Sequence, residues 1–587
     1  MPLASPRRTA GARGAAATII AAAVLACFPI VLAFVRHDGA PIGADTPVYV
    51  WWARLVGSAG ASSVAFRPGV PVVTEVVSRS FGLPETAAVA GLGCALIAMA
   101  GLAASGLLRT GGERARVALA GLILTGMFAT YLAAGHLSNA VFAAVFVLAL
   151  AFLIEQRPAA SAVAVALLTA AGIAHPEFLW LAVAILVGAA ALAFVAGSRR
   201  EAASIAVVGL AGSGLTAVGL LAASAGSTAF DVPTSLDVFL IQTNQVERLH
   251  QLFLERFIPK VAGYALWAWL PLAAASVPRL RGRLGRLLVA WLVVTVIGVV
   301  AGLVGQWFPP HRVVAFAFCL PLLGAIGLGV IGDRLPRFAT PIAVIVVASI
   351  ALSAVWLWTK APRPYVDPAT NAVTAVAPTV AATPGTVVVD VPTDRDARAV
   401  AVIRSLNLLR AAVPGDRVGD VLLRYPAPTD GDPDAASLWR ATEDAAVHAL
   451  ASGSATEVTA PAVPPSTPPL SVTEAFLATL AWLAVCGVAG SGWCLAAGHR
   501  GLALVERATG TGLAGLILAG VVVDRFGLRL GSRPVAIAVV AAVTGGGFAT
   551  SAASRSWRAR RRARSTGATT TPATRASLPS STAPSLP

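Results

Sequence analysis

The chain has 587 residues, of which 57% are hydrophobic and only 12% are charged. This balance excludes an ordinary soluble protein of such length and indicates a membrane protein. The formal charge of +16 does not indicate a nucleic-acid partner, because the arginines lie in short loops between apolar runs, where arginine is a typical topology signal. The five cysteines form no CxxC pair, and we interpret them as small buried apolar residues.

A membrane-spanning helix needs ~20 mostly apolar residues, and fourteen runs approach that length. The first run follows Arg7, Arg8 and Arg13 and has no clear cleavage site, so we expect a retained span and not a signal peptide. The fourteen predicted spans lie near 14–35, 85–108, 117–134, 139–154, 159–174, 178–197, 203–222, 261–277, 287–305, 313–331, 339–358, 473–497, 511–523 and 535–553.

The arginines in the short loops predict the orientation in the membrane. A cytoplasmic N-terminus places most of them, and the basic tail, on the cytoplasmic side. We therefore expect a multi-pass plasma-membrane protein with both termini in the cytoplasm. One loop disagrees, because residues 524–534 carry Arg525, Arg529 and Arg533 but fall outside.

Three long segments then face outward, at 36–84, 223–260 and 359–471. The third contains the strand-like run "TVVVDV" and the helix-like run "ARAVAVIRSLNLLRAAV", and it ends in a Pro-rich linker. The predicted fold class is an all-α polytopic membrane protein with fourteen transmembrane helices and a small extracytoplasmic α/β lobe. The expected parts are a transmembrane domain at 1–358, the lobe and linker at 359–471, further transmembrane helices at 472–554, and a basic, disordered tail at 555–587.

The polar residues that could carry chemistry gather at the outer ends of the predicted spans. No Asp, Glu, Lys or Arg lies in the middle of a span, which argues against an ion-coupled transport path. The candidates are Asp38, Asp45, Trp51, Trp52, Arg54, His136, Asn139, His175, Glu177, Gln306, His311 and Arg312. Each has a structural alternative: helix capping for Asp45 and the histidines, anchoring at the membrane interface for the tryptophans, and snorkelling for Arg312.

Four stretches carry a resemblance to a known family: "GADTPVYVWWARL", "AGHLSNAVFAAVFVLAL", "AGIAHPEF" and "PPHRVVAFAFCLPLL". Together with the long first outer loop, they resemble the GT-C superfamily of integral-membrane glycosyltransferases over roughly the first 360 residues. The sequence is rich in Ala and Arg and has lysine only at 260 and 360, which suits an actinobacterial member.

The resemblance implies a donor sugar linked to polyprenyl phosphate and its transfer, on the outer face, to a cell-envelope glycan or protein. It implies that Asp45 is the base, with Asp38 as second choice, and that His311 and Arg312, with Gln306 nearby, hold the donor phosphate. Trp51, Trp52, Arg54, His136, Asn139, His175 and Glu177 are then the candidates for binding the acceptor. The first loop lacks the adjacent pair of acids that many members have, so a divalent cation is left open and no cofactor is assigned.

Two other functions fit the same residues. A transporter or flippase for a lipid-linked glycan would need a polar path between the spans. A non-catalytic scaffold for envelope assembly would tolerate the loss of the polar residues at the outer ends.

Overall fold

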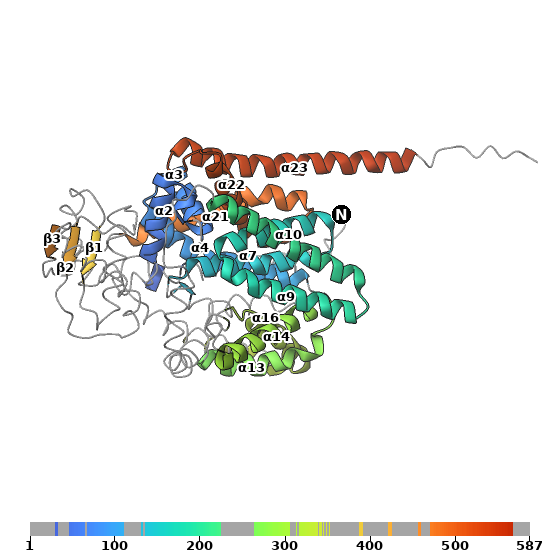
Figure 1. Cartoon of the computed structure of the whole chain (residues 1–587). Coiled ribbons are helices and arrows are strands. Elements are labelled where there is room, and N and C mark those ends of the chain that lie inside the picture. The colour runs from blue at the N-terminus through green and yellow to red at the C-terminus, as the bar shows by residue number, and fades with distance from the viewer. Residues whose placement is uncertain are drawn as a thin grey trace, which may run out of the picture.

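The computed structural model describes residues 46–64, 67–110, 131–132, 135–224, 263–305, 316–338, 387–390, 421–424, 456–459 and 470–567, with isolated positions near 27–32, 313 and 340–352. Within these residues the protein is a bundle of helices, shown in Figure 1. Seven of the described helices are long and apolar enough to cross a membrane. The chain is thus an α-helical membrane protein.

Among the described residues, three shorter helices precede the first of these spans. Helix α2 covers Thr46–Ala59 and leads through the short helix η1, Ala61–Val64, into α3, Gly69–Phe81. Gly82 ends α3 with a left-handed backbone, φ 65°, and its N–H donates to the carbonyl of Ser78, which is a common helix stop. Helix α3 is absent from the predicted spans, since Glu75 and Arg79 interrupt its apolar pattern.

The central part of the bundle follows the predicted spans closely. Helix α4 covers Glu85–Thr110 and is almost entirely enclosed by other helices. The next four described helices are α7 (Leu137–Leu153), α8 (Pro158–Ala174), α9 (Pro176–Val195) and α10 (Arg199–Ser224). Large apolar side chains on α9 and α10 are exposed, including Trp180, Phe194 and Leu210, as expected for side chains that face lipid.

A second group of helices packs beside α9. Helix α13 covers Gly263–Ser276 and is followed by η3 (Val277–Arg279), α14 (Gly282–Gly305) and α16 (Cys319–Arg334). The indole N–H of Trp291 in α14 donates to the carbonyl of Phe316, 3.0 Å away, and joins α14 to the segment before α16.

Three short strands lie in the segment for which an α/β lobe is predicted. They are β1 (Val387–Asp390), β2 (Val421–Arg424) and β3 (Thr456–Thr459), and they pair in parallel in the order β1-β2-β3. The first two correspond to the runs "TVVVDV" and "VGDVLLRY" of the sequence.

The C-terminal part returns to the bundle as three long helices, α21 (Val472–Ala496), α22 (Leu502–Arg525) and α23 (Arg533–Gly567). Helix α22 is longer than the predicted run at 511–523, because its first turns carry charged residues that the bundle buries. The predicted boundary at 554 falls inside α23, which continues as a helix through the arginine-rich stretch to Gly567. Arg and Ala favour helix, so the basic stretch extends the span without a break.

Close backbone contacts hold α21 and α22 together. A Cβ at Gly490 of α21 would lie 1.9 Å from the carbonyl oxygen of Ala508, and one at Gly512 of α22 would lie 1.9 Å from that of Cys486. Only glycine allows this approach, which is the usual way for helices to pack tightly in lipid.

Candidate functional site

Several helix ends meet at one end of the bundle, which we call the α3 end. Helices α2 and α3, the first turns of α4, α7 and α9, and the loop between α22 and α23 come together there (Figure 1). The predicted candidates Trp52, Arg54, His136, Asn139, His175 and Glu177 all lie at this end. The structure thus gathers residues that the sequence places in separate loops.

The start of α7 is capped by a residue from α2. The backbone N–H of Ser138 donates to the hydroxyl of Tyr49, 3.0 Å away. His136 occupies the N-cap position of α7, but its side chain makes no capping bond. Trp52 packs edge to face against Tyr49, with ring centroids 5.3 Å apart, and Asn139 is almost buried. Tyr49 of α2 therefore positions the start of α7, and Trp52 packs against Tyr49.

His175 is structural in its geometry. Its side chain is 1% exposed, its Nδ1 accepts a hydrogen bond from the backbone N–H of Phe178, and its ring stacks on the Phe178 ring at 4.2 Å. These contacts are those of a helix cap for α9. The next acid, Glu177, accepts from Arg67 at 2.8 Å and ties the start of α9 to the segment before α3.

A chain of charged side chains runs across the α3 end. Nε of Arg79 donates to Oε1 of Glu75 at 2.7 Å, and Nη2 of Arg79 donates to Oε1 of Glu85 at 3.0 Å. Nε of Arg54 donates to Oε2 of the same Glu85 at 3.4 Å. Two arginines are thereby held in place by two glutamates from α3 and α4.

Glu75 is fully buried, with a side-chain exposure of 0%. Its Oε2 has no hydrogen-bond partner within the described part of the chain. Burial raises the pKa of Glu75 to about 7, against the opposing effect of Arg79. A buried carboxyl group that titrates near neutrality is more typical of functional sites than of structural ion pairs.

Two glycines make room for this carboxylate. A Cβ at Gly57 of α2 would lie 2.2 Å from Oε1 of Glu75, and one at Gly531 would lie 2.3 Å from the carbonyl oxygen of Gly57. The loop after α22 therefore closes over α2 directly above Glu75.

An open polar hollow of about 410 Å³ lies beside this point. Its lining includes Arg79, Glu85, Gly531 and Arg533, and the backbone turn at Gly82. Arg533 is exposed and has no ion-pair or hydrogen-bond partner among the described residues, whereas Glu85 is already paired with two arginines. The hollow therefore offers an available cation and suits a negatively charged ligand.

The loop after α22 brings its other arginines to the same end. The backbone N–H of Ala61 donates to Oδ2 of Asp524 at 2.9 Å, which fixes the end of α22 against η1. Arg525 and Arg529 interact electrostatically with this carboxylate. This is the loop whose arginines disagree with the predicted topology, and two of those three arginines, Arg525 and Arg529, interact with Asp524.

Sequence reasoning missed Glu75, Arg79, Glu85 and Arg533. The available signal was the pair of charges at Glu75 and Arg79, four residues apart within an apolar run and therefore on one face of a helix. The predicted base residues Asp38 and Asp45 and the predicted phosphate-binding residues Gln306, His311 and Arg312 lie outside the described residues. Trp51 lies in α2, next to Trp52.

No group of three or more His, Cys, Asp or Glu side chains in the described ranges is arranged to hold a metal ion.

A second charged cluster lies at the opposite end, which we call the Glu506 end. Glu506 is fully buried in α22 and accepts hydrogen bonds from Ser105 and Arg109 of α4. Its neighbour Arg507, 1% exposed, donates to Glu155 at 2.8 Å. These bonds join α22 to α4 and to the end of α7.

His499 completes this second cluster. Its Nε2 lies 3.6 Å from Oε1 of Glu155. Burial, followed by the positive charges of Arg507, Arg157 and Arg109, lowers the pKa of His499 to about 3, so the ring is neutral at physiological pH. Each buried acid of this cluster is paired with at least one arginine, which is the pattern of a structural network.

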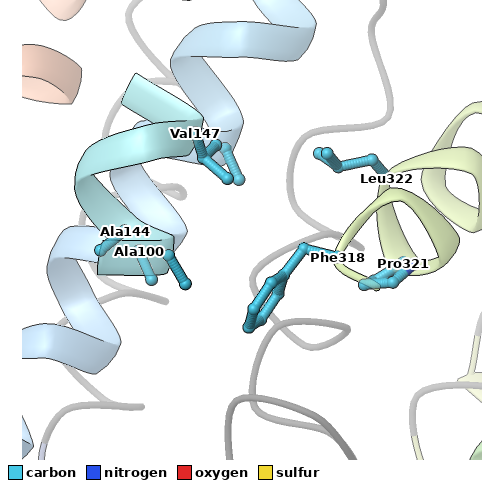
Figure 2. A pocket seen from close by; sticks show the side chains of 8 residues that line it. Ala100, Ala144, Val147, Phe318, Pro321 and Leu322 are labelled. Carbon is cyan, nitrogen blue, oxygen red and sulfur yellow. The ribbon is translucent and has the colours of Figure 1, made fainter. Parts of the chain in front are cut away.

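Between α4, α7 and the start of α16 lies a small apolar gap. Figure 2 shows Ala100, Ala144 and Val147 on one side of it and Phe318, Pro321 and Leu322 on the other. Its volume of about 10 Å³ has room for about one water molecule, and its lining is apolar throughout. It is too small for a substrate, so the hollow at the α3 end is the better candidate site.

No protein-family model matches the sequence, and a comparison with curated proteins finds no similar one.

Proposed function

We propose that the chain is an integral-membrane glycosyltransferase of the GT-C type. It moves a sugar from a polyprenyl-phosphate donor to a cell-envelope acceptor at the α3 end of the bundle. The observation that supports this proposal is the polar hollow, which is lined by Arg79 and Arg533 and flanked by the buried Glu75. The hollow adjoins the segment between the first predicted span and α4, which contains one of the four stretches that carry the resemblance.

The transfer step needs a carboxylate that acts as base and cationic groups that stabilise the leaving phosphate. A carboxylate removes the proton of the acceptor hydroxyl as its oxygen attacks the anomeric carbon of the donor sugar. The bond between that carbon and the phosphate oxygen breaks, and polyprenyl phosphate leaves with the bonding electrons. We assign the base to Asp45 on the sequence prediction and the stabilisation of the leaving phosphate to Arg533 and Arg79. Guanidinium groups suit this role, since they can bond two phosphate oxygens at once.

Arg79 depends on Glu75 for its position, since Glu75 Oε1 holds its Nε. Glu75 is thus a positioning residue, whereas Arg79 lines the hollow itself. The partly protonated Glu75 leaves more of the positive charge of Arg79 available to an anionic ligand than a fully ionised partner would.

The decisive experiment is a transfer assay with purified protein in nanodiscs, a panel of polyprenyl-phosphate sugars, and cell-envelope extract as acceptor. A charge-assisted hydrogen bond contributes about 1.5–3 kcal/mol, so Arg533→Gln and Arg79→Gln should each reduce transfer about ten- to a hundredfold. Arg500→Gln is the matched control, because Arg500 is also exposed but lies at the Glu506 end. Wild-type rates in both hollow variants would contradict the assignment of the donor phosphate to the hollow.

The transport alternative predicts a different outcome. A flippase would move a lipid-linked glycan between the leaflets of a vesicle without breaking the glycosidic bond. Movement without transfer in the same preparation would favour that function, and the absence of both would favour a scaffold.

A further inference from the structure

Helix α23 is the longest described helix, with 35 residues from Arg533 to Gly567. In Figure 1 it extends well beyond the other helices of the bundle. Its part Arg533–Trp557 has the length and composition of a membrane span. These 25 residues rise about 37 Å at 1.5 Å per residue, which exceeds the ~30 Å thickness of the hydrocarbon core. The residues that follow Trp557 therefore begin at the level of the lipid headgroups.

The chemistry of the helix changes at this level. Six arginines fall within residues 555–564, which we call the basic segment, and no acidic residue occurs anywhere after Asp524. Trp557 is 57% exposed, and an exposed tryptophan is typical of the membrane interface. This interface marker thus lies within the basic segment, and five of the six arginines follow it on the same helix.

The arginine positions do not define one face of the helix. At 100° per residue, positions 555, 558, 560, 561, 562 and 564 spread over about 220° of the helix circumference. A flat acidic protein surface would meet only some of them. A layer of phosphate groups that surrounds the helix would meet all of them, and the guanidinium group matches phosphate geometry.

We propose that the basic segment of α23 binds the phosphate headgroups of anionic lipids in the leaflet at the Glu506 end. The continuity of the segment with the span keeps it within a Debye length, roughly 8–10 Å, of that surface. Clusters of basic residues directly after a span are attracted to anionic headgroups for the same electrostatic reason. This inference does not depend on the proposed glycosyltransferase activity.

The test uses the full-length protein with its five native cysteines replaced and an environment-sensitive fluorophore attached through Thr566→Cys. The protein is titrated in detergent with short-chain phosphatidylglycerol or phosphatidylcholine. The wild type should bind the anionic lipid at least tenfold more tightly than the zwitterionic one, and salt should weaken this preference. Replacement of all six segment arginines by glutamine should abolish it.

A matched control separates the effect of the basic segment from the effect of the overall net charge. Six other arginines at the Glu506 end are exposed and can be changed to glutamine with the same loss of charge: Arg199, Arg200, Arg281, Arg334, Arg337 and Arg500. This control variant should keep the lipid preference. An equal loss in both variants would overturn the proposal, as would a wild type that does not distinguish the two lipids. A fluorescence response to RNA equal to that with anionic lipid would also overturn it and would favour a nucleic-acid partner.

Discussion

Nε of Arg79 donates a hydrogen bond to Oε1 of Glu75, 2.7 Å away, and this ion pair connects a fully buried carboxylate to the wall of the polar hollow. The pair lies one turn apart on α3, so a single short helix supplies both the cation that faces the hollow and the group that positions it. The net charge of this pair therefore depends on whether Glu75 is protonated, although Arg79 lines the hollow and Glu75 does not.

The first prediction is a stability that falls with rising pH. The pKa of Glu75 is raised from 4.5 to about 7, so the folded protein holds this proton more tightly than the unfolded chain. The stabilisation is complete below about pH 4.5 and is lost as the pH rises through about 7, with a total of about 3 kcal/mol. Glu75→Gln should reduce this slope. The measurement is the melting temperature in nanodiscs from pH 5 to pH 8.

Glu177→Gln is the control for that slope. It also removes an acid paired with an arginine at the α3 end, but it leaves Glu75 in place. An unchanged slope in Glu75→Gln would show that other groups cause the pH dependence.

The second prediction concerns the base. Asp45 precedes α2, in the stretch that resembles the family, whereas Asp38 lies earlier in the same loop. Asparagine has the shape of aspartate but cannot accept the proton, so Asp45→Asn should reduce transfer at least a hundredfold, about 2.7 kcal/mol. Asp38→Asn should retain most activity. Comparable turnover by Asp45→Asn and the wild type would remove Asp45 from the mechanism.

The third prediction concerns the buried cluster at the Glu506 end. Glu506→Gln leaves Arg109 and Arg507 without their shared carboxylate, and breaking a buried ion pair costs about 3–5 kcal/mol. We expect a large drop in melting temperature. The exposed pair Arg279–Asp333 provides the comparison, since Asp333→Asn should change stability by less than about 1 kcal/mol. Similar effects of the two substitutions would argue against a stabilising role for the cluster.

The fourth prediction separates capping from substrate binding at His175. Loss of a helix cap costs about 1 kcal/mol, so His175→Ala should lower the melting temperature moderately. Asparagine can also accept the bond from the Phe178 N–H, and His175→Asn should recover part of the loss. Transfer per folded molecule should stay near the wild-type value in both. A selective loss of transfer in His175→Asn would instead support the substrate-binding prediction.

The fifth prediction concerns orientation. Leu528 is exposed in the loop at the α3 end, and Ala196 is exposed after α9 at the opposite end. In a background without native cysteines, an impermeant thiol reagent should label Leu528→Cys on intact cells and Ala196→Cys only after lysis. The reverse pattern would place the hollow in the cytoplasm and rule out transfer on the outer face.

The sequence alone predicted the long apolar helices that the structure describes, together with the polar residues near their ends. The described long helices lie close to predicted runs, because a helix of ~20 consecutive apolar residues matches the thickness of the hydrocarbon core of a membrane. The sequence also predicted the starts of α7 and α9 to within about two residues, and a helix that begins after Asp45. The length of α22 was underestimated, since Glu506 and Arg507 look unsuitable for a span until their partners are known.

The sequence does not show which polar residues meet in the folded bundle. Tyr49 caps α7 from 89 residues away, and Asp524 anchors η1 across 463 residues. The hollow likewise joins Arg79 of α3 to Arg533 at the start of α23. The pattern of apolar residues shows which face of a helix is buried, but it does not show which other helix covers that face. For Glu75, α2 and the loop at Gly531 lie over the carboxylate and contribute to the burial that raises its pKa.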